Sequence, residues 1–187
     1  MTRRFAAAPL DPAHVGALLD LARHAPSAGY SQGVHFLVLS GDSLATFWQV
    51  TGADEWFADV QEGVLLAPVV VLPLADPSAY TARYAESDKA GHGLDDAANW
   101  AVPFWLTDAA MAVQNLLLLA EDDGLGALYF GIFRNARRLL DELGVPSHVL
   151  QVGAVALGRR AADDAASGSA RTRPRRAVAE VVHHDRW

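Results

Sequence analysis

Residues 23–40 read RHAPSAGYSQGVHFLVLS, in which a helix stops, a small polar loop follows and an apolar strand begins. Pro26 lacks a backbone donor and disfavours the helical conformation at Ala25, while Gly29 permits a tight or left-handed backbone. The loop can therefore hold several amides free to face a ligand. An ordinary polar connection would show the same pattern, so these residues alone leave both interpretations open.

The size and charge of the chain limit what it can be. It has 187 residues, of which 51% are hydrophobic, which is enough for one sizeable domain and too little for two independent cores. We therefore expect a single domain over residues 1–187. The net charge is −7 and Lys89 is the one lysine, so no broad cationic face is offered to nucleic acid or to an anionic membrane.

The sequence contains no cysteine. Disulfides, thiolate metal sites and a cysteine nucleophile are thereby excluded, and any redox chemistry must come from a cofactor. Adjacent histidines at 183 and 184 would point to opposite faces of a strand, so no metal site is expected. Residues 1–9 lack the apolar core of a signal peptide, and no stretch approaches the ~20 uninterrupted apolar residues of a membrane helix. We expect a cytoplasmic protein without a membrane partner.

Helical and strand patterns alternate along the chain. The predicted helices cover residues 12–24, 43–50, 107–121 and 134–143, and the predicted strands cover residues 35–39, 69–74, 127–130, 152–158 and 178–187. Asp11 and Thr107 are candidate N-caps. The helix over residues 107–121 is apolar almost all round, which predicts burial inside the domain or at an interface between subunits.

Three stretches fall outside this alternation. Residues 76–102 form a long polar excursion that we interpret as a lid, because long loops in compact domains are usually functional or disordered. Residues 159–172 are rich in Ala, Asp, Ser and Gly and are interpreted as a linker. Residues 173–187 form a C-terminal extension.

Two common chemistries are not supported by the motifs. Gly124 and Gly126 follow a predicted helix and precede a strand, the reverse of the dinucleotide-binding fingerprint. Ser27 cannot be read as the nucleophile of a serine hydrolase, because its loop lacks the first glycine of a nucleophile elbow and follows a helix instead of a strand.

Three segments share their order and spacing with a known family. They are the loop at residues 25–32, the helix at residues 108–120 with its trailing Gly-Leu-Gly, and the Arg-Pro-Arg at residues 173–175 before a terminal Glu-Val-Val-His. Together they resemble the FMN-dependent nitroreductase family over nearly the whole chain apart from residues 76–102. The resemblance implies an α+β sandwich with a mainly antiparallel sheet flanked by helices. It also implies a homodimer with an FMN in each subunit interface and a C-terminal extension that reaches the partner subunit.

The resemblance further implies roles for particular residues. The positions that match flavin-binding positions of the family are Arg3 near the pyrimidine ring, Ser27 and Gln32, the backbone of Phe130, Gly131 and Ile132 near the reactive nitrogen, and Arg173 and Arg175 at the phosphate. An arginine fork suits phosphate, and a cation near the pyrimidine ring stabilises reduced flavin. Three positions depart from the family pattern, since Tyr30, Gly33 and Val34 stand where Asn, Pro and Trp are usual.

The implied activity is flavin-dependent electron transfer from NAD(P)H to a small planar acceptor such as a nitroaromatic, a quinone or an unsaturated carbonyl. No side chain is expected to be an obligatory acid or base, because the cofactor carries the chemistry. Tyr84, Trp100 and Phe104 are predicted to bind the acceptor by stacking, although they could equally pack the lid onto the core. The alternative is a diverged dimer that binds flavin or another small molecule without NAD(P)H turnover.

Overall fold

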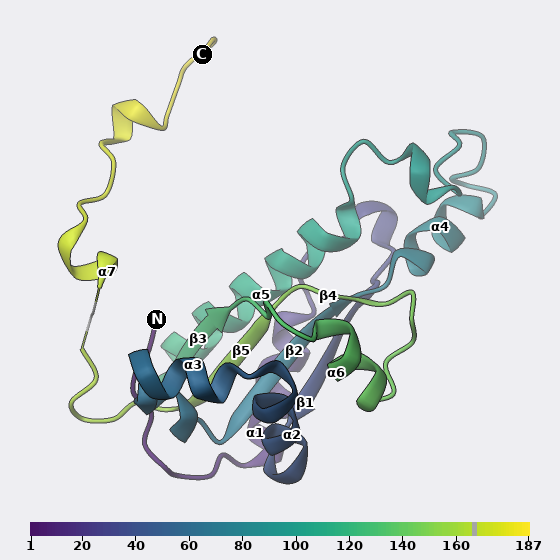
Figure 1. Ribbon diagram of the computed structural model, residues 1–187. Helices are drawn as coiled ribbons and strands as arrows, with labels where there is room; N and C mark the ends of the chain where they lie inside the picture. Colours follow the sequence, from purple (N-terminus) through teal and green to yellow (C-terminus); the bar gives the residue numbers. More distant parts are fainter. Residues whose placement is uncertain (166–167) are drawn as a thin grey trace.

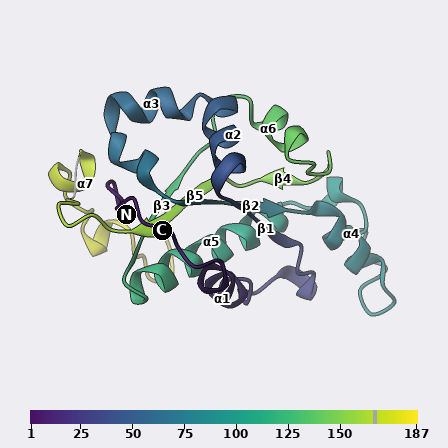
Figure 2. The same cartoon turned by 90° about the horizontal axis from the view of Figure 1, so that it is seen from below.

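The computed structural model describes residues 1–165 and 168–187 and has three layers (Figures 1 and 2). A sheet lies in the middle. One face is covered by α1 (Pro12–Ala22) and α5 (Phe104–Asp122), and the other by α2 (Gly41–Thr51), α3 (Ala53–Val60) and α6 (Ala136–Glu142). This α+β arrangement confirms the predicted fold class.

The sheet is antiparallel at every pairing. Its strand order is β1 (Val34–Leu39), β2 (Val69–Ala75), β5 (Ala154–Arg159) and β3 (Leu125–Phe130), and the short β4 (Leu150–Gln151) pairs with the end of β2. Every residue of β2 is buried. Because side chains alternate along a strand, Val69 and Val71 pack towards α1 and α5, while Val70 and Leu72 pack towards α2, α3 and α6.

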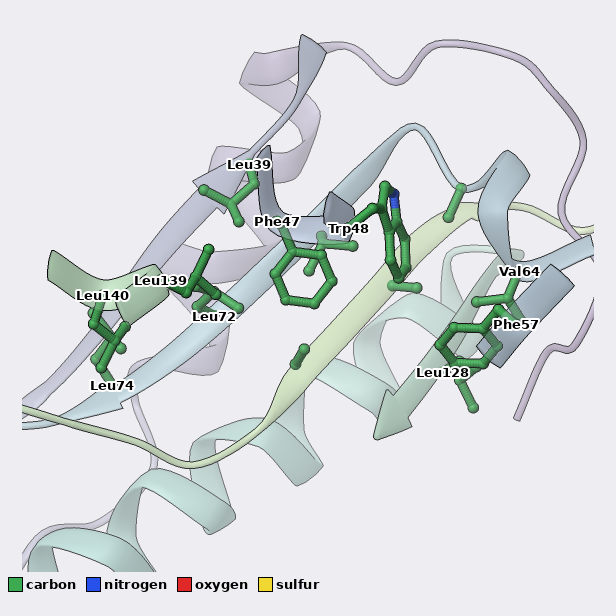
Figure 3. Close-up of a cluster of buried hydrophobic side chains, with 14 of the residues drawn as sticks. Leu39, Phe47, Trp48, Phe57, Val64, Leu72, Leu74, Leu128, Leu139 and Leu140 are labelled. Carbon is green, nitrogen blue, oxygen red and sulfur yellow. The ribbon is translucent and has the colours of Figure 1, made fainter. Parts of the chain in front are cut away.

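Aromatic rings dominate the core beneath α2 and α3 (Figure 3). Phe47 and Trp48 come from α2 and Phe57 from α3, and Leu139 and Leu140 of α6 close one side. The rings of Phe47 and Trp48 meet edge to face, with centroids 4.8 Å apart. These contacts hold α2, α3 and α6 against one face of the sheet.

The long helix α5 has two different faces. Its buried face includes Ala109, Ala112 and Leu116 and packs on the sheet and on α1. Its other face leaves Met111 and Leu118 exposed in this single chain. Across the described residues, no helix combines the length and the apolar character that crossing a membrane requires.

One predicted helix start was wrong, and a helix inside the predicted lid was missed. The helix predicted from Thr107 begins at Phe104 after Pro103, so Thr107 is not its cap, and its hydroxyl donates to the carbonyl oxygen of Phe104 within the first turn. Inside the predicted lid, α4 (Pro77–Ala85) forms a helix. The Asp76 side chain accepts a hydrogen bond from the Ser78 amide and caps it.

The predicted strand over residues 178–187 was also wrong for this chain. Val178–Glu180 form a 3-10 turn, and the segment 168–187 runs away from the body of the molecule (Figure 1). Its side chains are exposed wherever burial is described. A strand needs a neighbour to satisfy its backbone, and the segment has none within the described chain. Within the predicted linker, Ser169–Thr172 form α7, and residues 166–167 lie outside the described residues.

Alanine substitutions at two glycines should change the stability of the fold in opposite directions, because α4 packs closely against Gly33 and no atom lies close to Gly16. A Cβ on Gly33 would lie 2.6 Å from the Tyr80 ring and 2.8 Å from the carbonyl oxygen of Asp76, so Gly33→Ala should destabilise the fold by about 1–3 kcal/mol. Gly16 lies inside α1 with open space around it, so Gly16→Ala should stabilise by about 0.5–1 kcal/mol. Urea unfolding of both variants measures the change in the free energy of unfolding. Equal effects at the two positions would contradict the packing described.

Candidate functional site

A cavity of about 530 Å³ opens between α2, α3 and the segment that follows β3. Its volume lies within the roughly 300–1,000 Å³ of small-molecule sites. Aromatic side chains of Phe47, Trp56 and Phe57 contribute to its lining, together with the backbone around Gly131. The cavity therefore offers flat apolar walls beside exposed peptide groups.

The segment after β3 is fixed at both ends. At its start, the Phe130 ring stacks on Trp48 with centroids 6.1 Å apart and meets Phe57 edge to face at 5.2 Å. At its end, Asn135 adopts a φ of 52° and donates a hydrogen bond from Nδ2 to the Val50 carbonyl oxygen at 2.8 Å. The loop between these anchors is consequently held against α2.

The predicted flavin-binding residues fall into several places. Phe130, Gly131 and Ile132 all line the cavity. Arg3 lines a neighbouring depression, and Asp59 borders both spaces. The backbone amide of Arg3 donates to Asp164 at 2.9 Å, which fixes the chain there.

Ser27 and Gln32 lie on the loop before β1 and do not line the cavity. The Gln32 amide donates to Ser27 Oγ at 3.0 Å. Tyr30 and Gln32 have φ angles of 59° and 54°, a backbone region that non-glycine residues rarely occupy. The loop is therefore a defined structure closed by its own side chains.

Asp108 of α5 holds this loop in place. Its side chain is 1% exposed, and Oδ2 accepts hydrogen bonds from the Ala28 amide at 2.9 Å and from the Tyr80 hydroxyl at 2.8 Å. Burial, reinforced by the bond to this carboxyl group, raises the pKa of Tyr80 far above its usual range, so the hydroxyl stays a donor. The sequence places Asp108 only within the predicted helix over residues 107–121, and no motif marks its partners.

Arg83 of α4 makes a second connection to the same loop. Its Nε donates to the carbonyl oxygen of Gly29 at 2.9 Å, and its two terminal nitrogens bind Asp88 at 2.7 and 2.6 Å. Hydrogen bonding from this guanidinium lowers the pKa of Asp88 to about 2. The loop is thus tied to both α5 and α4.

The predicted acceptor-binding residues form an aromatic cluster beside this loop. The Trp100 ring meets Tyr84 at 4.9 Å and Phe104 at 5.9 Å between centroids. Trp100 Nε1 donates to the Leu94 carbonyl oxygen at 2.8 Å. A Cβ on Gly29 would lie 2.7 Å from the Tyr84 ring. Within one chain this cluster adjoins the 27–32 loop and does not line the cavity.

Arg173 and Arg175 are exposed on the C-terminal segment. Over residues 1–165 and 168–187, neither side chain makes a hydrogen bond or an ion pair, and neither lines the cavity. The same described residues contain no group of three His, Asp or Glu side chains placed to hold a metal ion.

The molecule is an antiparallel sheet covered by helices on both faces, with a ligand-sized cavity at the end of β3. The model of the nitroreductase family matches residues 1–159, and the chain belongs to that family. A nitroreductase from Desulfovibrio desulfuricans, solved in complex with FMN, is 25% identical with a TM-score of 0.67 and covers 100% of this chain and 91% of its own. Bacillus megaterium NfrA2 shares the fold with a TM-score of 0.76 at 20% identity, over 100% of this chain and 70% of its own.

A curated relative matches a shorter part of the chain. It is an NADPH-dependent oxidoreductase of Staphylococcus aureus, 35% identical over 81 residues. The match covers 43% of this chain and 31% of that protein, so the chain aligns with about a third of its length.

The Asp108 connection predicts a non-additive pair of substitutions. Asp108→Ala leaves the buried Tyr80 hydroxyl and the partly buried Ala28 amide without an acceptor, and should cost about 1–3 kcal/mol for the hydroxyl and less for the amide. Tyr80→Phe removes one of these donors, so the double variant should be less destabilised than the sum of the single variants by about 0.5–3 kcal/mol. Urea unfolding of the four proteins gives the coupling. Strict additivity would show that the hydroxyl and the carboxyl group do not share a bond.

Proposed function

We propose that this protein is an FMN-dependent oxidoreductase that passes electrons from NAD(P)H to a small planar organic acceptor, in the range of nitroaromatics, quinones and unsaturated carbonyls. The observation that carries the proposal is the cavity built against the backbone of residues 130–132. Support comes from membership of the nitroreductase family, from the relative with FMN and from the relative named as an NADPH-dependent oxidoreductase.

The residues of the cavity fit a flat heteroaromatic ring. Trp56 and Ile132 give it accessible apolar surface beside the buried rings of Phe47 and Phe57, and Gly131 brings main-chain groups to the wall without a side chain in the way. Bound FMN would supply hydride-transfer chemistry, and the protein would supply position and electrostatics. Arg3, in the depression that meets the cavity at Asp59, is the cation we assign to the pyrimidine end.

The remaining predicted ligands call for a second subunit. Four of them do not line the cavity of their own chain, namely Ser27, Gln32, Arg173 and Arg175. We propose that they complete the site in a homodimer, in which the extended segment 168–187 reaches the partner. The arginine pair would then bind the phosphate through charge-assisted hydrogen bonds.

The surface that the second copy would cover lies on α5. Phe104, Met111 and Leu118 are exposed at intervals of seven residues, which places them in one stripe along the helix. Exposed apolar stripes of this kind mark interaction surfaces. Because Phe104 belongs both to this stripe and to the cluster of Tyr84 and Trp100, pairing along α5 would carry that cluster to the interface, where it would form one wall of the acceptor site.

The flavin content of the purified protein tests the activity. We expect about one FMN per subunit in the as-isolated absorbance spectrum, and we expect anaerobic NADPH or NADH to bleach it, because a hydride donor reduces bound flavin. Protein without flavin would contradict the proposal. Flavin that stays oxidised with both donors would favour the alternative, a dimer of this fold that binds flavin without NAD(P)H turnover.

The oligomeric state tests the dimer. Leu118→Glu places a charge on a side chain that is 59% exposed in the single chain, so it should leave the fold intact but separate the subunits and lower flavin retention. Leu66→Glu is the control, because Leu66 is similarly exposed, at 44%, in the short helix packed beside α3. Light scattering and flavin-to-subunit ratios measure both effects. A wild-type monomer at micromolar concentration would refute the dimer.

A further inference from the structure

Arg134 is the one basic side chain that lines the cavity. Across residues 1–165 and 168–187 it makes no hydrogen bond and no ion pair. Its neighbours differ, since Arg137 pairs with Asp141 at 2.8 Å and Arg138 pairs with Glu142 at 2.9 Å. Arg137 and Arg138 therefore have carboxylate partners within the protein, whereas the guanidinium of Arg134 is available to bind a ligand in the cavity.

The position of Arg134 is set by its surroundings. Asn135, the next residue, is tied to α2 through the Val50 carbonyl oxygen, and α6 follows at once with Leu139 and Leu140 buried. The backbone that carries the guanidinium is thus fixed at the rim. A planar guanidinium held there binds a carboxylate through two parallel hydrogen bonds.

Two carboxyl groups line the same cavity from α3. Glu55 and Asp59 are one helical turn apart and both exposed, and Asp59 also borders the depression that contains Arg3. Both carboxylates repel a negatively charged ligand group near α3. The cavity therefore has an acidic helical wall and a basic loop wall, and this polarity orients an anionic group towards Arg134 and away from α3.

Two aromatic side chains of the cavity lining are largely exposed. Trp56 is 57% exposed and Phe133 is 93% exposed. A Cβ on Gly131 would lie 2.8 Å from the Phe133 ring, so this ring lies directly beside the backbone that we assign to the flavin. Such rings stack on a planar molecule.

We propose that the acceptor is an aromatic molecule with an anionic substituent, a carboxylate in its simplest form, whose ring stacks at the mouth of the cavity and whose charge is bound by Arg134. The reduction of this acceptor rests on the proposed function. The preference for binding an anionic aromatic molecule over a neutral one does not rest on that function, because it depends only on the cavity lining. Arg134 is accordingly a specificity-determining residue.

The test compares 4-nitrobenzoate with 4-nitrobenzamide, which have similar size but differ in charge. The holoenzyme should favour the carboxylate about tenfold in kcat/KM, which corresponds to about 1.4 kcal/mol. Arg134→Gln should remove this preference, and Arg134→Lys should retain part of it because the charge remains. Arg138→Gln is the matched control, since Arg138 is paired with Glu142 and does not line the cavity, and should keep the full preference. Glu55→Gln should increase it.

Calorimetric binding of benzoate and benzamide to the same holoproteins gives a readout without turnover. A preference for benzoate that Arg134→Gln abolishes supports the inference. If the proteins bind in this way but reduce neither nitro compound, the proposed function fails while the anion site stands. The inference is overturned if the wild type does not discriminate between the carboxylate and the amide, or if folded Arg134→Gln discriminates as well as the wild type.

Discussion

Asp108 is an almost fully buried carboxyl group that joins three parts of the chain, and the arrangement of one end of the molecule depends on it. It lies on α5 and accepts two hydrogen bonds, one from the Ala28 amide in the loop before β1 and one from the Tyr80 hydroxyl of α4. A buried carboxyl group is tolerated only when its oxygens have donors, so the loop and α4 must both stay in place. Gly33 belongs to the same constraint, because a side chain there would displace the Tyr80 ring.

The cavity is organised by aromatic packing on the face of the sheet that α2, α3 and α6 cover. Trp48 and Phe57 hold Phe130 at the point where β3 ends, and Asn135 ties the following loop to α2. This packing leaves the cavity open beside Gly131 and places Arg134 on its wall. The cavity and the 27–32 loop thus each carry part of the predicted flavin set without meeting in one chain, which is why we propose that a second copy completes the site.

Several features could be read from the sequence because their causes are local. Asp11 before Pro12 predicted the start of α1, and the β-branched apolar run at residues 69–74 predicted the buried strand β2. Asp76 before Pro77 is the same signal and starts α4, although the polar composition of residues 76–102 drew the interpretation towards a lid. The terminal strand could not be judged from its pattern alone, because a strand forms only when a neighbouring strand is available.

The sequence by itself determined the family, because the order and spacing of three segments are properties of the chain, and this resemblance implied the α+β class and the residues around 130–132 as a candidate site. Only the tertiary structure decided that Asp108 accepts hydrogen bonds from Ala28 and Tyr80, that Tyr84 and Trp100 pack beside that loop, and that Arg134 lines the cavity. These contacts join residues that are far apart in the sequence or lie on different elements. Which side chains meet is fixed by packing in three dimensions, and no local pattern records it.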